Sequence, residues 1–193
     1  MPDDRRAMQP TAVESGFEVV IWFLDRAIAD GEYLQPQKLQ RLLYLAQAYY
    51  GVAKHGQKLM PATFIAADDG PLEPTLFRAF ERGRPAVDVR PIEADVQHVL
   101  DSIWRQFGAH STDRLTKLVQ RHPPYVEAYD AAPLSEIPFE NMIKFYGTQG
   151  LKRRQNKGNI DVTPVDKVLR PKVLRNHDGK PVNVRRWAPR RVD

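Results

Sequence analysis

Apolar residues recur with helical spacing along most of the chain, and the clearest pattern lies in residues 35–53. Pro36 stands near the start of this segment, where a proline is favoured in the first turn of a helix. At 100° per residue, the apolar positions cover roughly half of the circumference. They are Leu39, Leu42, Leu43, Leu45, Ala46, Tyr49, Tyr50, Val52 and Ala53. This wide apolar arc predicts the central helix of the fold.

The remaining positions of the same helix form a mostly polar stripe. It consists of Gln37, Gln40, Arg41, Tyr44, Gln47, Gly51 and Lys54. Tyr44 is the one large aromatic residue in this stripe. We expect it either to pack with its hydroxyl in water or to contact a partner.

The same periodicity, together with proline and capping residues, predicts further helices on both sides of the central one. The first runs over 11–30, from a capping box formed by Thr11 and Glu14 to the stop at Gly31. The others are a helix over 72–82, one opened by Pro91, one capped by Ser111, a short helical turn through Tyr129 and one from Pro138. Residues 62–67 favour at most a small strand, followed by a tight turn at 68–71.

These elements predict a mostly α protein with a single helical domain over residues 11–147. A flexible lead precedes it over 1–10, and a basic, extended or disordered tail follows over 148–193. Prolines recur too often in this tail for long helices. They are Pro164, Pro171, Pro181 and Pro189.

The net charge of +5 is distributed unevenly. Residues 1–150 carry 16 Lys and Arg against 20 Asp and Glu, whereas residues 151–193 carry 13 against 4. The tail could contact phosphates and stack an aromatic ring on a base, dock on a protein through apolar anchors set in positive charge, or remain solvated. The candidate contact residues are Lys152, Arg153, Arg154, Arg170, Lys172, Arg175, Arg185, Arg186, Trp187, Arg190 and Arg191.

Several classes of chemistry find no support in the sequence. The chain has no cysteine, which excludes disulfides and thiolate zinc sites, and its five histidines do not occur at metal-ligand spacing. No glycine-rich phosphate loop or nucleophile motif is present, so we expect no catalysis, metal or cofactor. No apolar run approaches the roughly 18 residues of a membrane span. We expect a cytoplasmic protein with no membrane partner.

Three ordered blocks resemble the Panacea antitoxin domain family, which includes GepA-like and SocA-like proteins. They are residues 38–47 (KLQRLLYLAQ), 56–59 (GQKL) and 70–80 (GPLEPTLFRAF). The aromatic residue that the family places before Gly-Pro is replaced here by Asp69. A fourth, weaker block contains Ser111, Leu115, His122, Pro123 and Tyr125. The resemblance covers about residues 11–147.

The resemblance implies the antitoxin of a two-gene toxin–antitoxin pair. Such a protein binds a cognate, SocB-like toxin directly and delivers it, as an adaptor, to ClpX of the ClpXP protease, with the tail as a possible protease-docking arm. The positions that match the motif and could contact the toxin are Lys38, Arg41, Tyr44, Gln47, Asp69, Gly70 and Pro71. Two alternatives remain: a plain antitoxin that neutralises by occlusion, and a nucleic-acid-binding regulator that uses the tail.

Overall fold

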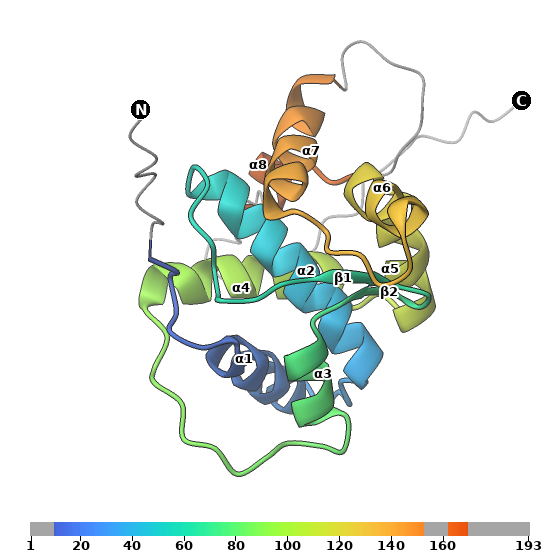
Figure 1. The fold of residues 1–193 in the computed structure, drawn as a ribbon. Helices are drawn as coiled ribbons and strands as arrows, with labels where there is room; N and C mark the ends of the chain where they lie inside the picture. Colours follow the sequence, from blue (N-terminus) through green and yellow to red (C-terminus); the bar gives the residue numbers. More distant parts are fainter. Residues whose placement is uncertain (1–9, 153–161, 170–193) are drawn as a thin grey trace, which may run out of the picture.

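A computed structural model describes residues 10–152 and 162–169 and confirms the mostly α fold (Figure 1). These residues form eight helices and a small two-stranded sheet. The elements are α1 (Gly16–Ala29), α2 (Pro36–Ala53), β1 (Ile65–Ala67), β2 (Gly70–Leu72), α3 (Pro74–Phe80), α4 (Ala94–Phe107), α5 (Thr112–Val119), α6 (Pro123–Ala131), α7 (Phe139–Lys152) and α8 (Val165–Leu169).

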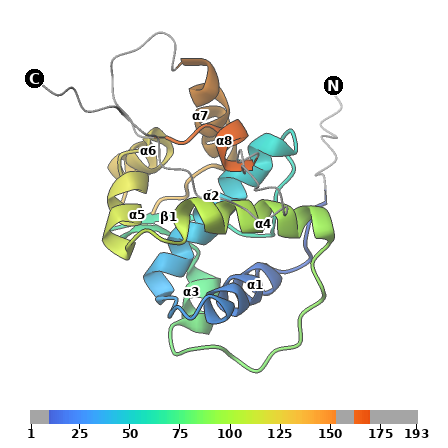
Figure 2. The same cartoon turned by 180° about the vertical axis from the view of Figure 1, so that it is seen from behind.

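Helix α2 lies at the centre of the domain, as its apolar pattern predicts. It runs through the middle of the molecule, and α4 crosses it on the side that faces the viewer in Figure 2. It packs against α4, α5, α7 and the β-hairpin. Fourteen of its 18 residues are buried, so most of its polar stripe is covered as well as most of its apolar arc.

Helix α1 begins later than the predicted capping box. Ser15 caps it, and its hydroxyl accepts a hydrogen bond from the amide of Phe17 at 3.2 Å. The preceding residues are not helical, and the amides of Ala12 and Val13 donate at 3.0 Å to the carbonyls of residues 58 and 59, respectively. The predicted helical start at Thr11 is therefore wrong.

Strands β1 and β2 form an antiparallel hairpin in which Ile65 pairs with Leu72 and Ala67 with Gly70. The predicted small strand is confirmed over part of its range. The predicted turn is shorter than expected, because residues 70–71 begin β2 and only Asp68 and Asp69 connect the strands. Helix α3 consequently starts at Pro74 and not at residue 72.

The later helices follow the predicted patterns closely. The predicted stripe of α4 is buried, since Val96, Val99, Leu100, Ile103 and Phe107 are each at most 5% exposed. Ser111 caps α5, and its hydroxyl accepts from the amide of Arg114 at 3.2 Å. The helix after Pro91 begins only at Ala94.

The folded part extends beyond the predicted boundary at residue 147. Helix α7 continues to Lys152, and α8 packs against α4 and α7. Val168 is 1% exposed, and the hydroxyl of Tyr49 donates to the carbonyl of Thr163 at 2.6 Å. The apolar residues of this segment bury against the core, which overrides the charged composition around them. The remaining candidate tail residues lie outside the described residues: Arg153, Arg154, Arg170, Lys172, Arg175, Arg185, Arg186, Trp187, Arg190 and Arg191.

Candidate functional site

Arg41 connects the central helix to the β-hairpin. Its side chain is 2% exposed and donates hydrogen bonds to the carbonyls of Asp69 and Pro71, the latter at 3.0 Å. Its Nε donates to the hydroxyl of Thr116 on α5 at 3.1 Å. Burial lowers the pKa of Arg41 to about 10, while the negative charge of Asp69 opposes this shift. Arg41 therefore stays charged at neutral pH and holds the turn end of the hairpin.

Gly70 makes this close approach possible. A Cβ added at Gly70 would lie 2.9 Å from Nε of Arg41, and the backbone there has φ of +114°, which L side chains rarely adopt. A glycine at position 70 is therefore required by the packing of the Arg41 guanidinium against the strand.

Two glutamines of the polar stripe also bond to backbone inside the protein. The Gln47 amide makes two 3.1 Å hydrogen bonds with Met60, donating to its carbonyl and accepting from its amide. The oxygen of Gln40 accepts from the amide of Glu73 at 2.8 Å. These bonds fix the chain on both sides of the hairpin against α2.

Tyr44 does not face solvent, so both expectations for it are wrong. Its side chain is 0% exposed, and its ring packs edge-on against Phe64 at 5.5 Å and near Tyr146 at 6.3 Å. Burial raises the pKa of its hydroxyl well above the ordinary value. Tyr44 is a core residue, because the hairpin region and α7 cover this side of α2.

Lys38 also differs from the prediction. It is 9% exposed, lies 3.6 Å from the carboxylate of Glu32 and has its ammonium 5.9 Å from the ring centre of Trp104. These contacts are with the α1–α2 connection and α4, and none of them is with the hairpin.

The turn of the hairpin is held from outside by α6 and the end of α5. The Gln120 amide donates to the carbonyl of Asp68 at 2.9 Å, and the Tyr129 hydroxyl donates to the Asp68 carboxylate at 3.1 Å. Tyr125 donates to the carbonyl of Ala67 at 2.7 Å. The hydrogen bond to Asp68 raises the pKa of Tyr129. The turn is therefore fixed while its carboxylates stay at the surface.

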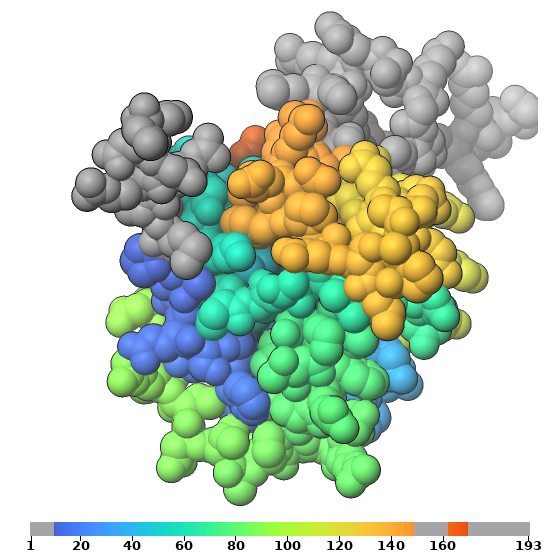
Figure 3. All heavy atoms as spheres, viewed as in Figure 1, coloured from blue at the N-terminus to red at the C-terminus, as the bar shows by residue number. Residues whose placement is uncertain are grey.

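The exposed groups beside this turn form one surface. Asp68 and Asp69 are exposed, Val126 is 37% exposed and Tyr129 is 41% exposed. Tyr129 stacks on Tyr125 with 5.5 Å between the ring centres, so its ring is held in place. Figure 3 shows the hairpin reaching the surface beside α6. We call the group of Asp68, Asp69, Val126 and Tyr129 the turn–α6 surface.

His122 lies between the end of α5 and the start of α6. It is the N-cap residue of α6 and is 1% exposed. Its Nδ1 lies 2.8 Å from the hydroxyl of Tyr146, within hydrogen-bonding distance.

The seven predicted toxin-contacting residues thus separate into two groups. Arg41, Asp69, Gly70 and Pro71 come together at the hairpin, but Asp69 alone among them is exposed. The other three, Lys38, Tyr44 and Gln47, are buried elsewhere on α2. The sequence prediction missed Tyr129. The spacing of Val126 and Tyr129 on one side of a short helix is the signal that could have identified it.

Comparison with known proteins gives no relative: no family model, no curated protein and no solved structure matches the chain. Within the part of the chain that is described, no three or more His, Asp or Glu residues are grouped as metal ligands would be. None of the described helices combines the length and apolarity needed to cross a bilayer.

Proposed function

We propose that the chain is an antitoxin that binds its cognate toxin directly through the turn–α6 surface. The observation that carries this proposal is the set of hydrogen bonds from Arg41 to the hairpin, which we call the Arg41 clamp. The polar motif residues use their hydrogen bonds to hold the backbone around the exposed turn. The residues that resemble the antitoxin family motif therefore hold the exposed turn in place from the interior of the protein.

The chemistry of the surface suggests the kind of toxin face that it fits. The carboxylates of Asp68 and Asp69 suit Lys and Arg side chains, and Val126 and the ring of Tyr129 suit apolar contacts. Tyrosine is enriched among the residues that contribute most to binding. Because the turn and the ring are already fixed, little ordering entropy would be lost on binding.

In this proposal the antitoxin acts in the cytoplasm as an adaptor that delivers the bound toxin to ClpX of the ClpXP protease. An adaptor has to hold its cargo and the protease at the same time. A folded domain followed by a basic segment suits this task, since tethering raises the effective concentration to the order of millimolar. The resemblance supports delivery, and the composition of the tail is compatible with it.

The proposal is tested by titrating the full chain with the toxin encoded by the adjacent gene, using calorimetry. We expect the double variant Asp68→Arg, Tyr129→Ala to bind at least about tenfold more weakly than the unmodified chain. The matched control is Tyr33→Ala, Asp88→Arg, which changes the same residue types at exposed positions outside the turn–α6 surface. Equal affinities of the two double variants would contradict the proposed surface.

A further inference from the structure

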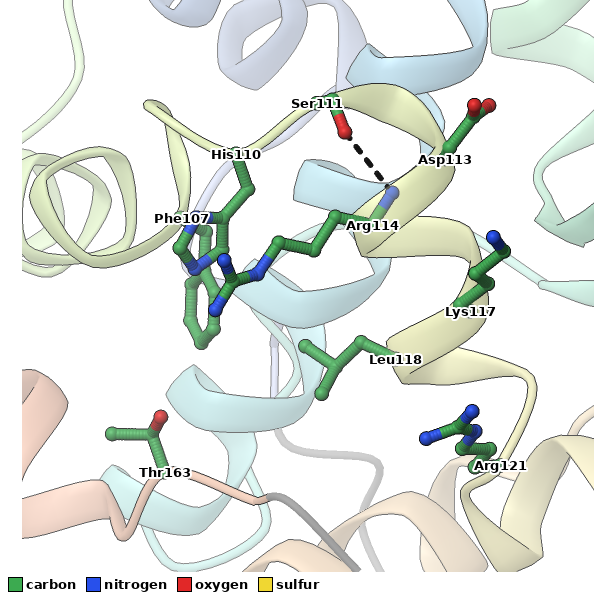
Figure 4. A pocket seen from close by; sticks show the side chains of 9 residues that line it. All are labelled: Phe107, His110, Ser111, Asp113, Arg114, Lys117, Leu118, Arg121 and Thr163. Carbon is green, nitrogen blue, oxygen red and sulfur yellow. Dashed lines mark hydrogen bonds between the residues drawn. The ribbon is translucent and has the colours of Figure 1, made fainter.

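A groove of about 400 Å³ lies on the far side of α5 from the Arg41 clamp (Figure 4). The end of α4, helix α5 and the segment before α8 form its walls. The lining residues that matter here are Phe107, Ser111, Arg114, Lys117, Arg121 and Thr163. Phe107 is buried at 2% exposure and belongs to the floor.

Three cations dominate the lining of this groove. Arg114, Lys117 and Arg121 are spaced by three and four residues, which places them along one side of the helix. All three are exposed, and no carboxylate of the described chain lies within ion-pairing distance of them. Asp113 also lines the groove, but Figure 4 shows its carboxylate pointing away from the Arg114 guanidinium.

Several other cations of the described domain are paired with carboxylates. Arg26 and Arg105 both pair with Asp101, and Lys54 lies 2.8 Å from Asp95. Unpaired cations that line a concave surface leave a local excess of positive charge, although the described domain is acidic overall. This combination favours an anionic ligand.

Thr163 belongs to the strongly basic part of the sequence. Residues 151–193 carry 13 Lys and Arg against 4 Asp and Glu, and residues 162–169 of this stretch are anchored next to the groove. Thr163 is fixed there through its backbone by Tyr49 and through its hydroxyl by Gln106 at 3.4 Å. Residues 162–169 therefore connect the groove to the basic part of the sequence.

We propose that this groove binds the phosphodiester backbone of a nucleic acid. The seven-residue spacing from Arg114 to Arg121 corresponds to roughly 10 Å along a helix axis, or about three nucleotide steps of one strand. Each cation would neutralise a phosphate and release its counterions. An extended polyanion suits the site because Arg114, Lys117 and Arg121 follow one another over about 10 Å along α5 and the turn after it, farther than one small anion can span. This activity goes beyond toxin binding and uses a different surface.

The test measures fluorescence anisotropy of a labelled duplex of about 20 base pairs with the full chain, from about 50 to about 200 mM salt. We expect binding by the unmodified chain to weaken steeply with salt. The variant R114A/K117A/R121A should bind at least about tenfold more weakly. The slope of its log affinity against log salt concentration should be shallower by roughly two to three.

The matched control R78A/R82A/K144A removes the same charge from exposed positions that do not line the groove. It should lose about threefold or less in affinity, because it changes only the overall charge. Equal losses in both triple variants, unchanged binding by the groove variant, or no binding by the unmodified chain would each overturn the proposal. Thermal unfolding checks that the variants are folded, and toxin binding by the groove variant should be unchanged, so the two functions are tested separately.

Discussion

Two regions on either side of α5 use arginine in opposite ways. On one side, Arg41 is 2% exposed and bonds to the hairpin carbonyls and to the hydroxyl of Thr116. On the other side, Arg114 and Lys117 are exposed along a groove and make no ion pair among the described residues. A cationic side chain therefore stabilises the fold where it is buried and hydrogen-bonded, and it is available to a ligand where it is exposed and unpaired.

The two regions also differ in the charge that they present outward. The turn–α6 surface exposes the carboxylates of Asp68 and Asp69, whereas the groove exposes three cations. Partners of opposite charge can therefore recognise the two surfaces with little competition.

The largest effect is expected for Tyr44→Ala. Removing a fully buried aromatic ring should lower the free energy of unfolding by about 3 to 5 kcal/mol, because a cavity remains in the core. The control is Tyr33→Ala, which removes an 82% exposed ring and should change stability by less than about 0.5 kcal/mol. Urea unfolding measures both. Similar stabilities would mean that Tyr44 faces solvent.

A smaller loss, about 3 kcal/mol, is expected for Arg41→Met. The change leaves the carbonyls of Asp69 and Pro71 without their donor in a buried place. Arg114→Met removes the same side chain from an exposed position one helix away and should cost less than about 0.5 kcal/mol. If the two variants unfold at the same denaturant concentration, Arg41 does not stabilise the fold more than the exposed Arg114 does, and the proposed contrast between the two arginines is wrong.

Gly70→Ala should cost about 2 kcal/mol, since it combines a strained φ with a contact on Arg41. The matched change is Gly56→Ala, where φ is +99° but nothing lies within 4 Å of the added Cβ. It should be the milder of the two by about 1 kcal/mol. Equal Tm values for the two variants would show that the contact with Arg41 has no energetic effect.

The smallest effect is a pH dependence at Glu73. Burial raises its pKa above 4.5, so the folded state holds this proton more tightly than the unfolded state. The resulting stability is present below pH 4.5 and is lost as the pH rises through the folded-state pKa. Glu73→Gln should therefore match the unmodified chain at low pH and exceed it above neutrality, by less than about 1 kcal/mol. A growing advantage of the unmodified chain with pH would contradict this sign.

The sequence predicts the helices of this fold well where two signals coincide. Pro36 and the apolar periodicity together locate α2 at the observed bounds, and Ser111 locates the start of α5. The hairpin is harder to predict. Gly70 and Pro71 are typical turn residues, yet they form a strand because Arg41 bonds to the neighbouring carbonyls.

The candidate site is predicted less well, because amphipathic periodicity assumes that polar residues face water. In α2, Gln40, Arg41 and Gln47 instead find backbone partners inside the protein, which allows the whole circumference to be buried. The exposed apolar residues of the site, Val126 and Tyr129, come from α6, a helix of only nine residues. Residues 162–169 were also mispredicted, since prolines and charges obscured the apolar side formed by Val165 and Val168.

The most direct test of the proposed function is degradation of the cognate toxin by purified ClpXP with and without the full chain. We expect the chain to accelerate degradation, and we expect the double variant Asp68→Arg, Tyr129→Ala to abolish this acceleration. Protection of a tightly bound toxin would contradict delivery and indicate an antitoxin that acts by occlusion. No binding and no change in the degradation rate would contradict the antitoxin function itself.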